Sequence, residues 1–166
     1  GLSASGCFAP GSDGRYARGV EPAAQSSLDP RRAAERDALV EKLRAFFRQC
    51  SGDYSAVYLF GSVARASFRD DSDLDLALIR SQPVERPAQR LHAELAGELE
   101  RLLDRRVEVI DLDGAPVDLG HRVLRDGILV HEADRSRRVA VETRLRARYL
   151  DLAPVLAEYR RLPRER

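Results

Sequence analysis

The sequence predicts an α/β or α+β fold, in which one sheet of about four strands is covered by helices on one side. Three observations favour this class. Some long segments carry apolar residues at helical spacing, short β-branched segments lie between them, and the two kinds alternate along the chain. With 166 residues, of which 43% are hydrophobic, the chain suits one domain with a substantial core.

The domain is expected to occupy residues 28–166. Residues 1–27 are rich in Gly, Ser, Ala and Pro and show no periodicity, which predicts a disordered leader or a segment foreign to the native protein. The first helix is predicted over about 30–50. Asp29 and Pro30 form an N-cap followed by proline at the first helical position, and the apolar residues that follow share one helical face.

The remaining elements alternate in type. Strands are predicted from β-branched or alternating apolar residues over 54–60, 74–79, 106–112 and 128–132. Helices are predicted for a short segment after Gly61, for about 87–104, for about 116–125, and from near Asp134 onward. Pro154 lies inside this last helix, and we expect it to kink or break the helix near Ala153.

Several classes of protein are disfavoured by composition. Cys7 and Cys50 are the only two cysteines, so no disulfide framework is implied, and a reducing, cytoplasmic compartment fits. No apolar run is long enough to span a membrane, and the chain begins with no secretory signal. We therefore expect no membrane association.

Charge is distributed unevenly. Residues 135–166 hold ten arginines against four acids, whereas the whole chain has a formal net charge of +1, so the remainder carries about −5. The basic segment could face an acidic protein or a nucleic acid, or it could be the solvated face of a helix.

Four aspartates crowd the segment 70–75. Asp73 and Asp75 enter the predicted strand, where residues two apart point to the same face, so their carboxylates should lie side by side and repel each other. A hard divalent cation such as Mg²⁺ would offset this repulsion, since it prefers carboxylate oxygens together with substrate phosphates. Asp70 and Asp71 are interpreted as loop acids that add negative potential.

Gly61 and Ser62 fit a phosphate ligand for such a cation. They lie where a predicted strand gives way to a short helix. Glycine allows close approach of the backbone, free N–H groups at a helix start favour an anion, and the Ser62 hydroxyl can donate to a phosphate oxygen. Arg65, one helical turn later, could add positive charge or form an ordinary surface ion pair.

A third carboxylate would be needed to hold a second metal or to orient an attacking hydroxyl. Glu108 is the candidate, because an acid in the middle of a strand is costly if it faces a core. Asp111 and Asp113 compete with it. Asp111 has the opposite strand parity, and Asp113 has the position of a turn residue before Gly114.

The segment GSVARASFRDDSDLDLAL resembles the signature of the DNA-polymerase-β-like nucleotidyltransferases in their minimal form. The downstream stretch RVEVIDLDGAPVDLGHRVLRDGILVHE and the Arg-rich helix with RARYLDLAPVLAEY resemble the MntA-type antitoxins of HEPN/MNT toxin–antitoxin pairs. The resemblance covers roughly residues 35–160. It implies a nucleotidyltransferase-type mixed sheet.

The resemblance also implies a function, which is transfer of AMP from Mg-ATP to a tyrosine of a partner HEPN ribonuclease toxin, silencing it. By position, Asp73, Asp75 and Glu108 would be the catalytic metal ligands for two Mg²⁺ ions. Gly61 and Ser62 would bind ATP, and Arg65 could assist them. The chain departs from the family pattern twice: Ala66 stands where the family has glycine, and Glu108 stands where it has Asp.

Two other functions stay open. The same chemistry could act on a small-molecule hydroxyl such as that of an aminoglycoside. Alternatively, the chain could be a non-catalytic antitoxin that covers its toxin with the Arg-rich C-terminal helix. We do not expect direct binding of nucleic acid.

Overall fold

The computed structural model describes residues 29–50, 54–82 and 89–161. The expected leader, 1–27, lies outside the described residues. The described elements, in chain order, are α1 (Pro30–Gln49), β1 (Tyr54–Phe60), α2 (Gly61–Ala64), β2 (Leu74–Arg80), α3 (Gln89–Leu103), β3 (Val107–Asp111), α4 (Val117–Asp126), β4 (Ile128–Glu132) and α5 (Arg135–Arg161).

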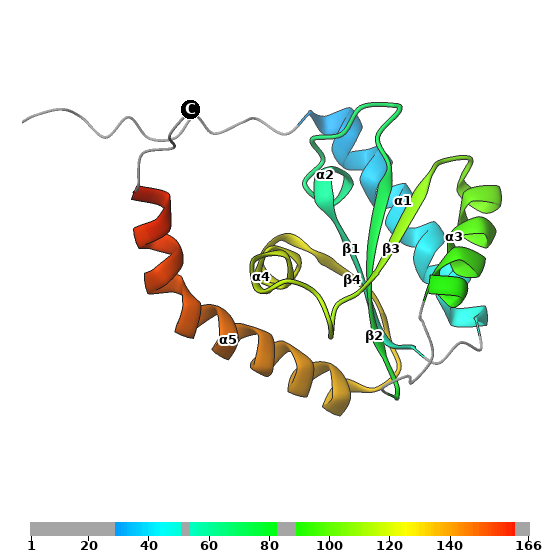
Figure 1. Cartoon of the computed structure of the whole chain (residues 1–166). Coiled ribbons are helices and arrows are strands. Elements are labelled where there is room, and N and C mark those ends of the chain that lie inside the picture. Colours follow the sequence, from blue (N-terminus) through cyan, green and yellow to red (C-terminus); the bar gives the residue numbers. More distant parts are fainter. Residues whose placement is uncertain (1–28, 51–53, 83–88, 162–166) are drawn as a thin grey trace, which may run out of the picture.

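The sheet is mixed, with the strand order β3-β2-β1-β4 (Figure 1). β1 pairs antiparallel with both β2 and β4, whereas β2 and β3 run parallel. The parallel pair is joined through α3, as a parallel connection requires a long crossover. The four strands and their mixed arrangement confirm the predicted fold class.

Helices cover both faces of the sheet, so the expectation of helices on one side was wrong. α1 and α3 pack on one face, where Phe47 and Leu99 join a core with Leu76 of β2. On the other face, Val123 of α4 and Leu145 of α5 pack on the central strands (Figure 1). The reason is that β1 and β2 are almost continuously apolar and bury both faces, a pattern that alternation alone does not reveal.

The first residues of α1 follow the predicted capping. The carboxylate of Asp29 accepts a hydrogen bond of 3.0 Å from the backbone N–H of Arg31, and Pro30 is the first helical residue. The other element bounds lie close to those predicted, although positions 87 and 88 of the expected third helix lie outside the described residues. Since caps and apolar periodicity are local signals, the sequence was sufficient for these bounds.

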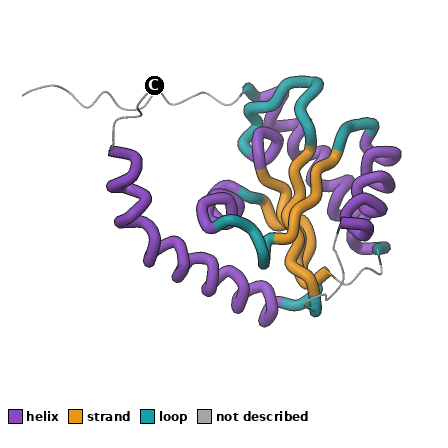
Figure 2. Tube along the Cα trace, in the orientation of Figure 1, coloured by secondary structure: helices purple, strands orange, loops and turns teal. Residues whose placement is uncertain are grey.

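The final helix α5 continues through Pro154 to Arg161, so of the expected kink or break near Ala153 the break does not occur, while the helix axis curves toward its C-terminal end (Figure 2). Proline removes the hydrogen bond to the carbonyl four residues earlier, that of Leu150. Leu150 and Pro154 are both exposed, so water can satisfy this carbonyl and no neighbouring element forces the chain to turn. No helix in the described ranges is both long and apolar enough to cross a bilayer.

The N-terminal half of α5 is held to the domain by charged groups. Glu142 is buried, and its carboxylate accepts hydrogen bonds from the Tyr58 hydroxyl of β1 at 2.5 Å and from Arg138 at 2.5 Å. Arg146 approaches the same carboxylate at 2.9 Å. Arg138 also pairs with Glu132 at the end of β4. Buried charges are tolerated when they are paired in this way.

Candidate functional site

The site begins at the junction of β1 and α2, where Gly61 has a φ of +74°. This backbone conformation favours glycine. A second constraint also requires glycine at position 61, because a side chain there would overlap the carboxylate of Asp75 on the neighbouring strand β2. Glycine therefore allows the chain to turn into α2 while its backbone lies directly against an acid.

A cavity of about 340 Å³ opens beside this junction. It brings together five of the six predicted site residues, from α2 with its C-cap and from strands β2 and β3, and adds residues of β1, β3 and α4. Its lining consists of Phe60, Gly61, Ser62, Arg65, Asp75, Glu108, Ile110, Leu119 and Arg122. Residues far apart in the sequence thus face one space.

Asp75 and Glu108 form the acidic wall of this cavity. They lie opposite each other in the parallel register of β2 and β3. Burial, together with the negative charges of Glu108 and Asp73, raises the pKa of Asp75 to about 6, and the positive charge of Arg65 opposes this shift. Neither Asp75 nor Glu108 forms an ion pair within 4.0 Å with another described residue. The acidic wall therefore carries charge that the described part of the protein leaves largely uncompensated.

Asp73 is the one predicted site residue that does not line the cavity. It precedes β2 and has a side chain that is 47% exposed. Its carboxylate lies 3.9 Å from Nε of Arg106. No cluster of three acids, histidines or cysteines in the described ranges is arranged to hold a metal ion. The assignment of Asp73, Asp75 and Glu108 as a ligand set accordingly stays a prediction.

The two competitors of Glu108 lie elsewhere. Asp111 lies 3.4 Å from Nε2 of His92 on α3, on the opposite face of the sheet, as its strand parity predicted. Asp113, in the turn after β3, accepts hydrogen bonds from Arg137 and Arg144 of α5. Of the three acids, only Glu108 reaches the cavity.

One departure from the family pattern, Ala66 in place of glycine, lies in the loop that follows α2. Ala66, which is buried, has a φ of +53°, and its N–H donates to the carbonyl of Val63 at 3.0 Å. Glycine adopts this left-handed conformation freely, whereas alanine does so at a cost of roughly 1 kcal/mol. The alanine therefore keeps the turn but makes it more strained. Asp70, in the same loop, is exposed and pairs with Arg32 at 2.6 Å, consistent with its interpretation as a loop acid.

Sequence reasoning missed the contribution of α4. Leu119 and Arg122 line the cavity from this helix, yet Arg122 is one of many arginines and belongs to no recognisable motif. Helical spacing places Leu119 and Arg122 on one face, and that was the only available signal.

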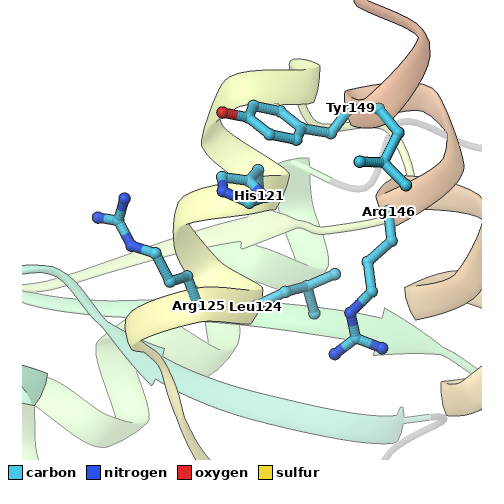
Figure 3. A pocket seen from close by; sticks show the side chains of 6 residues that line it. His121, Leu124, Arg125, Arg146 and Tyr149 are labelled. Carbon is cyan, nitrogen blue, oxygen red and sulfur yellow. The ribbon is translucent and has the colours of Figure 1, made fainter. Parts of the chain in front are cut away.

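A second cavity, of about 320 Å³, lies on the other side of α4, between α4 and α5 (Figure 3). The rings of His121 and Tyr149 stack there, with centroids 3.5 Å apart and an interplanar angle of 4°. Leu124 and Leu150 make this cavity largely apolar, whereas Arg146 reaches back to Glu142. Tyr149 thus helps to pack α5 against α4.

Comparison with known proteins supports one family. The family model described as "Polymerase beta, Nucleotidyltransferase" matches residues 41–136. No curated protein sequence matches the chain.

Solved structures with the same fold include subunits of toxin–antitoxin complexes. A chain from a toxin–antitoxin crystal structure with AMP-PNP is 20% identical with a TM-score of 0.57, and the alignment covers 72% of this chain and 97% of that one. A chain of the MntA-HepT toxin–antitoxin structure is 20% identical, with a TM-score of 0.51 and coverages of 74% and 97%.

A third structure contains the tri-AMPylated HEPN toxin of Shewanella oneidensis in complex with the MNT antitoxin. Its matching chain is 19% identical with a TM-score of 0.54, and the alignment covers 75% of this chain and 98% of that one. These likenesses show the fold, and the family match covers more than half of the chain. The protein therefore belongs to the polymerase-β nucleotidyltransferase family.

Proposed function

We propose that this protein transfers AMP from Mg-ATP to a tyrosine of a partner HEPN-type ribonuclease toxin and thereby acts as its antitoxin. The observation that carries the proposal is the cavity in which Gly61 and Ser62, at a strand-to-helix junction, face Asp75 and Glu108. Support also comes from the family and from the fold shared with toxin–antitoxin subunits, one in a complex with an ATP analogue and one in a complex with an AMPylated toxin.

The acids of the site fit a hard divalent cation. Asp75 and Glu108 are carboxylates whose charge is largely uncompensated, and Asp73 adds a third carboxylate two residues before Asp75. Oxygen ligands of this kind suit Mg²⁺, and we propose that these three residues hold two such ions. When bound, the ions would neutralise phosphate charge and favour ionisation of the attacking hydroxyl.

The other residues of the cavity bind and orient the nucleotide in this proposal. The Ser62 hydroxyl and the free N–H groups at the start of α2 donate to phosphate oxygens, and Arg65 adds charge. The tyrosine oxygen forms a bond to the α-phosphorus while the bond from that phosphorus to the pyrophosphate oxygen breaks. Glu108 would accept the proton of the tyrosine hydroxyl. The products are AMP-tyrosine and pyrophosphate.

Intact-mass spectrometry tests the proposal. The toxin encoded next to this gene is incubated with the protein, Mg²⁺ and ATP, and we expect its mass to rise by one AMP or a whole multiple. The double variant Asp73→Asn/Asp75→Asn should abolish the gain. A matched control, Asp70→Asn/Asp71→Asn, removes the same charge from the exposed loop and should leave the gain in toxin mass unchanged.

Other outcomes would contradict the proposal. An unmodified toxin that forms a stable complex on a sizing column would indicate an antitoxin that acts by binding alone. If there is neither modification nor a complex, radiolabelled ATP should be screened against small hydroxyl compounds such as aminoglycosides.

A further inference from the structure

The geometry points to Arg122 of α4 as a second phosphate-binding arginine, which holds the β- and γ-phosphates of the nucleotide in the cavity that Asp75 and Glu108 also line. The inference rests on the proposed function, since it concerns the triphosphate of the same cavity. It assigns a residue that lies far from the Gly-Ser and Asp-x-Asp segments, in an element that those motifs do not include.

The cavity has two kinds of charged wall. Asp75 and Glu108 come from adjacent strands of the sheet, whereas Arg65 follows α2 and Arg122 belongs to α4. A bound cation coordinates only some of the phosphate oxygens of a nucleotide. The remaining oxygens of a triphosphate need donors, and guanidinium groups provide paired donors with the right geometry. The second wall supplies such groups.

Arg122 differs from Arg125 on the same helix in having no hydrogen-bond or ion-pair partner among the residues that the structure describes. Arg125, one turn later, donates two hydrogen bonds of 2.7 Å to the carboxylate of Asp126. Arg122 and Arg65 form no ion pair within 4.0 Å to any residue of the described ranges. Several surface arginines also lack partners, but Arg65 and Arg122 are the two in the described part of the chain that line this cavity.

Packing fixes which face of α4 is turned toward the cavity. Leu119 and Arg122, one turn apart, line the nucleotide cavity, whereas His121, Leu124 and Arg125 line the separate cavity against α5 (Figure 3). Gly120 is buried, and a Cβ on it would lie only 3.2 Å from the side chain of Leu145 on α5. The backbone of α4 at Gly120 therefore lies close against α5, and this arrangement leaves Arg122 on the side of the nucleotide cavity.

The chemistry of transfer decides which phosphates Arg122 holds. The α-phosphorus must lie near the carboxylates and remain open to the incoming hydroxyl on the side opposite the leaving group. The wall formed by Arg65 and Arg122 is then left for the β- and γ-phosphates, which depart as pyrophosphate. Arg122 should therefore matter for ATP and pyrophosphate and not for AMP.

Calorimetric titration with Mg²⁺ and either AMP-PNP, pyrophosphate or AMP tests this assignment. We expect Arg122→Gln to weaken binding of AMP-PNP and pyrophosphate by about 10- to 100-fold, the range for a hydrogen bond to a charged group, while AMP binding stays within about twofold. Arg122→Lys should recover part of the loss, because it keeps the charge without the paired donors. Arg125→Gln is the matched control on the same helix and should bind all three ligands like the wild type.

Three results would overturn the assignment: unchanged AMP-PNP binding by Arg122→Gln, an equal loss for AMP and AMP-PNP, or no AMP-PNP binding by the wild type. Circular dichroism checks that the exposed substitution leaves the fold intact. Two further results separate the assignment of Arg122 from the proposed function. If the wild type shows Arg122-dependent binding but leaves the toxin unmodified, the transfer proposal fails and the assignment stands. If the toxin is modified and Arg122→Gln has the wild-type KM for ATP, the assignment fails and transfer stands.

Discussion

Any side chain on Gly61 would occupy the space of the Asp75 carboxylate. The two residues are fourteen positions apart, and the antiparallel register of β1 and β2 brings them together, with Phe60 opposite Asp75. The Gly-Ser segment and the Asp-x-Asp segment are therefore a single packed unit. Binding of phosphate by the first and of a cation by the second would share one rigid support.

Substitution of Gly61 should damage both stability and activity. We expect Gly61→Ala to lower the free energy of unfolding by about 1–2 kcal/mol from the left-handed backbone alone, and displacement of Asp75 should abolish AMP transfer. The control is Gly97→Ala in α3, where a new Cβ meets nothing within 4 Å. It should raise the free energy of unfolding by about 0.5–1 kcal/mol. Urea unfolding measures both changes, and an active Gly61→Ala variant would refute the shared support.

Asp75 should give the magnesium-free protein a distinctive dependence on pH. Burial and the neighbouring acids raise its pKa to about 6 from an ordinary value of 3.8, so the folded state binds the proton more tightly than the unfolded state. Stability should therefore fall as pH rises from about 4 to about 6. Asp75→Asn should remove this component and be more stable than the wild type at pH 8 by about 1 kcal/mol, a value reduced for solvent screening. Urea unfolding at several pH values measures this. If the free energy of unfolding changed equally with pH for both proteins, the prediction would be contradicted.

The Glu142 cluster should stabilise the attachment of α5. Burial raises the pKa of Glu142, but hydrogen bonds from Tyr58 and Arg138 outweigh it and hold the pKa below its ordinary value of 4.5. This stabilisation is present above the unfolded pKa and is lost as pH falls through the folded value. At pH 7, Tyr58→Phe should cost about 1 kcal/mol and Glu142→Gln about 2 kcal/mol. In chemical unfolding the loss caused by Glu142→Gln should shrink toward pH 3; a loss independent of pH would exclude the charge as its source.

Two arginines of α5 should respond differently to charge reversal. Arg144 pairs with Asp113, whereas Arg148 is exposed and has no ion pair among the described residues. Arg144→Glu should lower the melting temperature by about 2–4 °C, corresponding to roughly 1 kcal/mol, and Arg148→Glu should leave it within about 1 °C. Equal effects in differential scanning calorimetry would show that the pair with Asp113 contributes nothing.

Local signals were sufficient for most of the fold. The N-cap at Asp29 and the apolar periodicity of α1 are properties of a few consecutive residues, and the structure follows them. Burial of both sheet faces was missed because a continuous apolar strand does not say how many layers surround it. The continuity of α5 through Pro154 depends on solvent access to one carbonyl, which no sequence pattern encodes.

For the candidate site, too, some residues could be predicted from local signals and others could not. Strand parity was enough to separate Glu108, which lines the cavity, from Asp111, which faces His92 of α3. Arg122 reaches the cavity only through the packing of α4 on α5, which involves residues far apart in the chain. The left-handed conformation of Ala66 could be suspected only from the family resemblance, which has glycine at this position, because alanine itself gives no signal for it.

The ion pairs of α5 have a consequence for how a partner would arrive. Arg137 and Arg144 are matched by Asp113, and Arg138 and Arg146 by Glu142. Each of these carboxylates is shared by two arginines and can offset only one positive charge, so part of the arginine excess in this segment remains. A protein diffusing toward the described part of α5 therefore meets a surplus of positive charge, and an acidic surface on that protein would be attracted from a distance. The association rate with such a partner should consequently fall between low and physiological ionic strength.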